Sequence, residues 1–131
     1  MRTAGMVLAL AALVPTFSAC SRHTPPDTSG GSPPDPTAEV ALRVVNHHWL
    51  DVTIYAIHSG ERNRVGVVGA TTSVTLLLPP YLLGPGREIR LLADPIGARG
   101  VATTETLVVQ PGQYIEWILE RGLSRSSVAV Y

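Results

Sequence analysis

Short runs of alternating apolar and polar residues recur along the chain after residue 39. Their period is close to two residues, as in β-strands, rather than the 3.6 residues of a helix. Each run is rich in β-branched residues, and no stretch offers ten residues of helical pattern. The pattern therefore predicts seven short strands and no long helix. They cover residues 40–44, 52–57, 65–68, 74–78, 89–93, 103–109 and 115–119.

Turn-forming residues separate these runs. We expect a hairpin loop at 59–63 and an end to the fourth run at Pro79-Pro80, since proline cannot donate to a strand ladder. Residues 81–83 can form one helical turn in a long crossover. Pro111-Gly112 predicts a type II turn in the last hairpin. The rhythm of strands and turns indicates an all-β protein with one small antiparallel β-sandwich over residues 38–131.

This sandwich resembles immunoglobulin-like and fibronectin-type domains, and also the transthyretin-like domains of exported proteins. The resemblance rests on the number of strands and the spacing of the turns. The Cys…Trp…Cys pattern of true immunoglobulin domains is absent, because the chain has a single cysteine, Cys20.

The first 19 residues carry the three parts of a bacterial export signal. Arg2 is positively charged, residues 6–14 are uniformly apolar, and the small residues Ser18 and Ala19 precede Cys20. The apolar run is shorter than the roughly 20 residues that a membrane-spanning helix needs. We interpret residues 1–19 as a signal peptide. One alternative is a plain secretory signal with a cysteine nearby by chance.

The same segment resembles the lipobox of bacterial lipoproteins. Ser18, Ala19 and Cys20 match that motif, whereas Phe17 stands where the family most often has Leu. The resemblance implies that Cys20 is linked to diacylglycerol and becomes the first residue, so the bilayer would be its first partner. Two or more acyl chains hold a protein stably on a membrane. Ser21, in place of an Asp, favours the outer over the inner membrane, on the periplasmic side.

Residues 20–37 combine the cysteine with a segment rich in proline, serine and glycine. This segment offers no apolar side chain to bury after Cys20, so it is expected to be a flexible tether. Such a tether would hold the folded domain away from the lipid surface.

Charge and motifs exclude several function classes. After Cys20, nine arginines and no lysine face ten acidic residues, and no basic cluster in the sequence indicates nucleic-acid binding. The chain lacks the G-x-S-x-G, H-E-x-x-H, C-x-x-C and P-loop motifs. We therefore predict no enzyme and no cofactor.

Three histidines raise the alternative of a metal-binding or small-ligand protein. They are His47, His48 and His58. Adjacent strand residues point to opposite faces, so His47 and His48 would ligate a metal together only from a loop. The ordinary interpretation is three loop histidines without a metal. A blue-copper site is excluded, because no methionine follows Cys20 and Cys20 itself is assigned to lipid.

The remaining candidates are apolar. Trp49 and Leu50 follow the histidines and are either an anchor for a protein partner or a plug at the sandwich end. Trp117 lies at an apolar position of its alternating strand, so we expect it in the core. Residues 121–131, ending at Tyr131, are a frayed end, an extra edge strand or a segment that pairs with another protein's sheet. The sequence thus favours a non-catalytic interaction or structural module in the cell envelope, such as an accessory subunit of a membrane complex.

Overall fold

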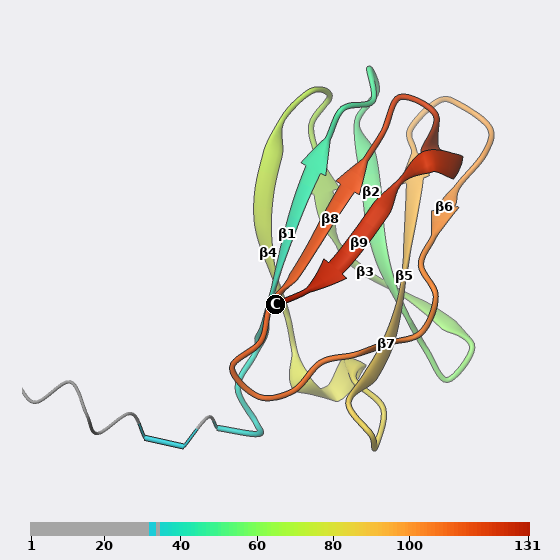
Figure 1. Cartoon of the computed structure of the whole chain (residues 1–131). Helices are drawn as coiled ribbons and strands as arrows, with labels where there is room; N and C mark the ends of the chain where they lie inside the picture. The colour runs from blue at the N-terminus through green and yellow to red at the C-terminus, as the bar shows by residue number, and fades with distance from the viewer. Residues whose placement is uncertain (1–31, 34) are drawn as a thin grey trace, which may run out of the picture. The chain divides into compact units, whose positions relative to one another are not determined.

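Figure 1 shows a computed structural model of the chain, which describes residues 32, 33 and 35–131. The predictions for the export signal, for Cys20 and for most of the tether concern residues outside this part. Within it, no helix is both long and apolar enough to cross a membrane.

The described residues form an all-β domain of two sheets (Figure 1). One sheet has the strand order β4-β1-β8-β9 and is called the β1 sheet. The other has the order β3-β2-β5-β6, with β7 also paired to β5, and is called the β2 sheet. The strands are β1 (Val40–Asn46), β2 (Val52–His58), β3 (Glu61–Val68), β4 (Ser73–Leu78), β5 (Glu88–Pro95), β6 (Ala102–Thr103), β7 (Leu107–Val108), β8 (Ile115–Leu119) and β9 (Ser127–Val130). Two short 3₁₀ turns are η1 (Pro80–Leu82) and η2 (Leu123–Arg125).

Most of the predicted strands are confirmed, with two differences in their limits. β3 begins at Glu61, because Ser59 and Gly60 both have positive φ and close a two-residue turn. The run 103–109 is divided into β6 and β7. There Thr104 exchanges hydrogen bonds with Leu91 through its backbone N–H and its side-chain Oγ1, at 2.9 and 3.0 Å, and this hydroxyl interrupts the regular ladder.

The prediction of a purely antiparallel sandwich is wrong. β1 and β8 pair in parallel, with Leu42 opposite Ile115, so the β1 sheet is mixed. Alternating side chains fix which face of a strand is buried, but they do not fix its direction relative to a neighbour. Because β8 pairs with β1 and β9 and not with β7, Pro111-Gly112 does not close a hairpin. It forms a turn, with Gly112 at φ 87°, that carries the chain from β7 in one sheet to β8 in the other.

The core lies between the two sheets. Trp117 on β8 is 1% exposed, as its parity predicted, and it is the largest of the fully buried side chains. The inward residues of β1 and β2 surround it, and Leu82 of η1 belongs to the same cluster. All the residues of this cluster lie between Val40 and Val130.

One side of the sandwich is closed by a close approach of β4 to β3. A register shift opposite Ile54 and Tyr55 bends β3 next to Gly66. A Cβ atom added to Gly66 would lie 2.8 Å from Leu76 Cδ2. The absence of a side chain at residue 66 therefore lets Leu76 pack directly over β3.

The strands place two sets of loops at opposite ends of the domain (Figure 1). The chain enters β1 at Val40, and β1 leads away from that entry over seven residues, about 20 Å. We call the end at which β1 finishes the loop pole. It contains the connections 47–51, 69–72, 96–101 and 120–126.

Candidate interaction site at the loop pole

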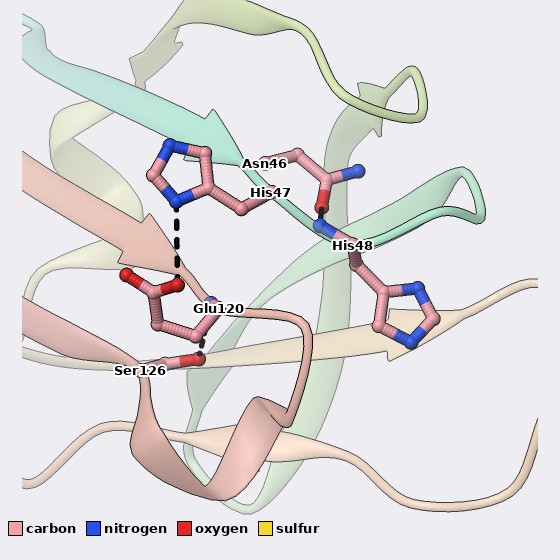
Figure 2. Close-up of polar contacts among 5 residues, drawn as sticks. All are labelled: Asn46, His47, His48, Glu120 and Ser126. Atoms are coloured by element: carbon pink, nitrogen blue, oxygen red, sulfur yellow. Dashed lines mark hydrogen bonds and ion pairs between the residues drawn. The ribbon is translucent and has the colours of Figure 1, made fainter.

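Asn46, the last residue of β1, organises the loop pole. Its side chain is fully buried, and its Nδ2 donates to the carbonyl oxygens of Leu50 and Gly69 at 3.0 Å and of Val68 at 3.4 Å. Its Oδ1 accepts a hydrogen bond from the backbone N–H of His48 at 2.9 Å (Figure 2). One amide thus satisfies backbone groups of two different loops, as a buried polar group requires.

His48 and Trp49 continue this arrangement outward. His48 is buried, and its Nδ1 accepts a hydrogen bond from the backbone N–H of Leu50 at 3.1 Å, so Nδ1 carries no proton. The His48 and Trp49 rings stack with centroids 4.6 Å apart. Trp49 is nevertheless 66% exposed, so it does not plug the sandwich end. The loop therefore holds a large exposed ring against a buried one, and Leu50 beside it is half-buried.

The three histidines do not form one group. Figure 2 shows the His47 and His48 rings directed to different sides of the loop. His47 Nδ1 lies 3.3 Å from Glu120 Oε2 at the end of β8. His58 is the last residue of β2, a strand of seven residues that starts at the loop pole, so His58 lies near the opposite pole. Among the described residues, no group of three His, Cys, Asp or Glu side chains is placed to hold a metal ion.

Two hollows flank the histidine loop. One, of about 540 Å³, is lined by His47, Thr71, Glu120, Arg121, Gly122 and Arg125. The other, of about 370 Å³, lies between His48-Trp49 and the loop around Arg99. Both are open to solvent. Trp49 shares the second hollow with Arg99 and Arg121 of the neighbouring loops.

The loop pole carries three arginines, the acidic residues Asp51 and Glu120, and exposed apolar side chains. Within the described part of the chain, Arg99, Arg121 and Arg125 form no ion pair. Ile96 and Val101, large apolar residues of the same pole, are also exposed. Exposed aromatic and aliphatic side chains bordered by arginine have the composition of a protein-binding surface.

Of the three alternatives for residues 121–131, the structure shows the extra edge strand, β9. β9 pairs with β8, and Tyr131 exchanges both backbone hydrogen bonds with Tyr114 at 3.0 and 3.1 Å. The two tyrosine rings stack with centroids 5.2 Å apart. Tyr131 therefore lies at the pole opposite Trp49, and the two do not share a surface. Residues 127–130 thus form an edge of the β1 sheet, and residues 121–126 belong to the loop pole.

Comparisons with known proteins identify no family for this chain. No family model matches the chain, and no curated protein matches it. Among solved structures, the chain is similar to an NMR structure of a protein from Eubacterium rectale. The two are 16% identical, with 77% of this chain and 93% of that chain covered and a TM-score of 0.40. This likeness concerns a small two-sheet β domain and carries nothing about function.

Sequence reasoning selected the histidines and Trp49 but missed Asn46. The signal in the sequence was an asparagine two residues after Val44, at a position where the alternation of the first strand places side chains on the buried face. The arginines of the loop pole were also missed, because 22 to 26 residues separate Arg99 from the other two and only the fold brings their loops to one end.

Proposed function

We propose that this protein is an exported, lipid-anchored interaction module of the bacterial cell envelope, without catalytic activity of its own. In this proposal residues 1–19 are the signal peptide, Cys20 carries the lipid, and the two-sheet domain is an immunoglobulin-like or fibronectin-like sandwich. The domain docks on a membrane-associated protein as an accessory subunit. The lipobox resemblance supports the anchor, and the surface chemistry of the loop pole supports the docking.

The exposure of Trp49 at the loop pole is the observation that carries this proposal. Burial of His48 and the hydrogen bonds of Asn46 fix the backbone on both sides of the ring, so little conformational entropy remains to be lost on binding. The pole also lies at the opposite end of β1 from the chain entry (Figure 1). A domain held at its entry end would therefore present Trp49 away from that attachment.

The loop pole also suggests the chemistry of the partner. Arg99, Arg121 and Arg125, which form no ion pair with the described residues, favour an acidic rim around an apolar centre on the other protein. Arg121 and Arg125 border the hollow that contains His47 and Glu120. Because these charges are exposed, association should weaken as ionic strength rises.

A photo-crosslinking experiment in native membranes tests the docking. A photoreactive aromatic residue replaces Trp49 in one variant and Tyr81 in a matched control. Tyr81 is 70% exposed on η1, near the opposite pole, so exposure alone does not distinguish the two positions. We expect one discrete protein adduct from position 49 and none from position 81. Equal labelling at both positions, or none at 49, would reject the proposed surface.

Mass spectrometry of the N-terminal peptide tests the anchor separately. The expected result is a chain that begins at Cys20 and carries a diacylglyceryl thioether. A chain that still begins at Met1, or an unmodified Cys20 thiol, would overturn the lipoprotein assignment.

A further inference from the structure

The outer edge of β9 has free backbone hydrogen-bonding groups. Tyr114 and Tyr131 form a pair that exchanges both bonds, and opposed residues alternate between bonded and non-bonded pairs along an antiparallel ladder. Ser127 and Ala129 therefore direct their N–H and C=O groups toward β8. Val128 and Val130 direct theirs away from it, and no strand of the described residues pairs with that side.

β9 also lacks the features that usually protect an edge strand. Residues 127–131 contain neither a charged side chain nor a proline. On the neighbouring β8, Glu116 is neutralised by Arg43 at 2.8 Å, so the outer face beside this edge has no net charge. A second, similar edge can therefore approach without repulsion between like charges.

The other edges of the two sheets differ from β9. β3 carries Glu61, Arg62 and Arg64, and β6 has only two residues. β4 is uncharged, but Leu76 packs over Gly66 there and closes that side of the sandwich. A regular, uncharged edge on an open side is thus found at β9 among the described strands.

A hollow lies beside this edge, between the two sheets. It measures about 450 Å³ and has a mixed lining: Trp117, Leu123 of η2 and Val128 of β9 are apolar, whereas Thr103, Thr104, Glu105, Ser124 and Ser126 are polar. A strand added alongside β9 would direct every second side chain toward the core side, next to this hollow. Backbone groups for pairing and space for alternate side chains together make a site for strand addition.

We propose that the occupant is β9 of a second copy of this chain, which pairs antiparallel about a two-fold axis at Ala129. In this register Val128 of each copy lies opposite Val130 of the other, and each pair exchanges two backbone hydrogen bonds. The side chains added over each hollow are then valines, which are apolar and β-branched. The outer side chains that meet at the axis are two alanines, whose small size permits the close approach of a non-bonded pair.

The resulting dimer joins the two β1 sheets into one sheet. Its interface is isologous, as expected of a two-fold pair, and short, because β9 has four residues. A short interface gives a weak dimer in dilute solution. Confinement of both copies to one membrane, under the proposed function, would raise their effective concentration. The Trp49 surface lies elsewhere, so it remains accessible in the dimer.

Disulfide trapping tests this register. A chain of residues 21–131 omits Cys20 and retains the complete core, which begins at Val40. Ala129→Cys would place two thiols at the axis, with Cα atoms about 4.5 Å apart, within the range of disulfides. The matched control is Ser127→Cys on the same face of β9, which would lie opposite Tyr131 rather than its own copy. We expect covalent dimer to form at least about tenfold faster from Ala129→Cys.

A second variant separates pairing from folding. Val128→Pro removes an N–H that points away from β8, so it should leave the domain folded while it removes an intermolecular bond. Combined with Ala129→Cys, it should slow trapping at least about tenfold in a domain that circular dichroism shows to be folded, although its unfolding midpoint should fall because Val128 packs against the core. Equal trapping rates at residues 127 and 129, or no effect of Val128→Pro in a folded domain, would overturn the proposal. An unmodified Cys20 would contradict only the lipid anchor of the proposed function. It would not affect this test of the dimer.

Discussion

Replacement of Asn46 by alanine should strongly destabilise the domain. The change removes the donor to the Leu50 and Gly69 carbonyl groups, at 3.0 Å each, and the acceptor of the His48 N–H at 2.9 Å. A buried polar group left without a partner costs about 1–3 kcal/mol. Because two of these three hydrogen bonds are only partly buried, we take the lower value for each of the three. The expected loss is about 3 kcal/mol, a large fraction of the roughly 5–15 kcal/mol that stabilises a typical domain.

The assay is urea unfolding of residues 21–131 at neutral pH. With a slope of about 1 kcal/mol per M, the midpoint should fall by about 3 M. Asn63→Ala is a matched control, since Asn63 is a strand residue with one long hydrogen bond, 3.4 Å, in an exposed position. Its effect should stay below about 0.5 kcal/mol. A loss at Asn46 no larger than that at Asn63 would refute the reasoning.

The isosteric change Asn46→Asp sharpens the same test. It keeps the acceptor for His48 but replaces the donating amide by an oxygen that faces three carbonyl oxygens. At neutral pH it should therefore destabilise at least as much as Asn46→Ala. Burial and the facing carbonyls should raise the pKa of the introduced carboxyl, so stability should return in part as the pH falls and the protonated group donates. A variant as stable as the wild type at neutral pH would contradict this role of the amide.

Three further predictions concern other parts of the domain. Trp117→Ala should lower the free energy of unfolding by about 3–5 kcal/mol, because it removes the largest fully buried side chain. Chemical unfolding measures this loss, and a loss below about 1 kcal/mol would show that Trp117 is not a core residue. Gly66→Ala should cost about 1–3 kcal/mol by displacing Leu76, and the shorter side chain of Leu76→Val should recover part of that loss; identical losses with and without it would disprove the contact. The side-chain and backbone hydrogen bonds from Thr37 hold the pKa of Asp35 below its ordinary value, so their contribution to stability is present at neutral pH and is lost as the pH falls through that pKa. An NMR titration of Thr37→Val should show the Asp35 pKa rising toward the ordinary value, and an unchanged value would assign the shift to another cause.

The strands were predictable from sequence because each buries one face, and burial leaves a direct signature in alternation. Val40, Leu42 and Val44 show this signature, and all three are buried. Pairing leaves no such signature, so the parallel contact between β1 and β8 could not be foreseen. The break between β6 and β7 depends on the Thr104 hydroxyl and its position beside Leu91, which is a tertiary relation.

The candidate site was predictable only in part. Trp49 stood out as an aromatic residue in a polar loop, but sequence could not distinguish a plug from an exposed anchor. Exposure depends on how His48 packs beneath the ring, and on the hydrogen bonds of Asn46 to the loop that contains Gly69. The grouping of His47 with Glu120 joins residues 73 positions apart, which no local pattern can reveal.

The parallel pairing of β1 and β8 also bears on how this chain acquires its structure during synthesis. β1 is the first strand to emerge, yet one of its two neighbours in the sheet, β8, follows about 73 residues later, as in the contact between Arg43 and Glu116. A chain crossing a membrane from its N-terminus would therefore expose one edge of β1 until nearly the whole domain had been translocated. Contacts so distant in sequence slow folding, because the intervening loop must be ordered first. During that interval the strand that later lies inside the sheet is open to chaperones, proteases and other unfinished chains.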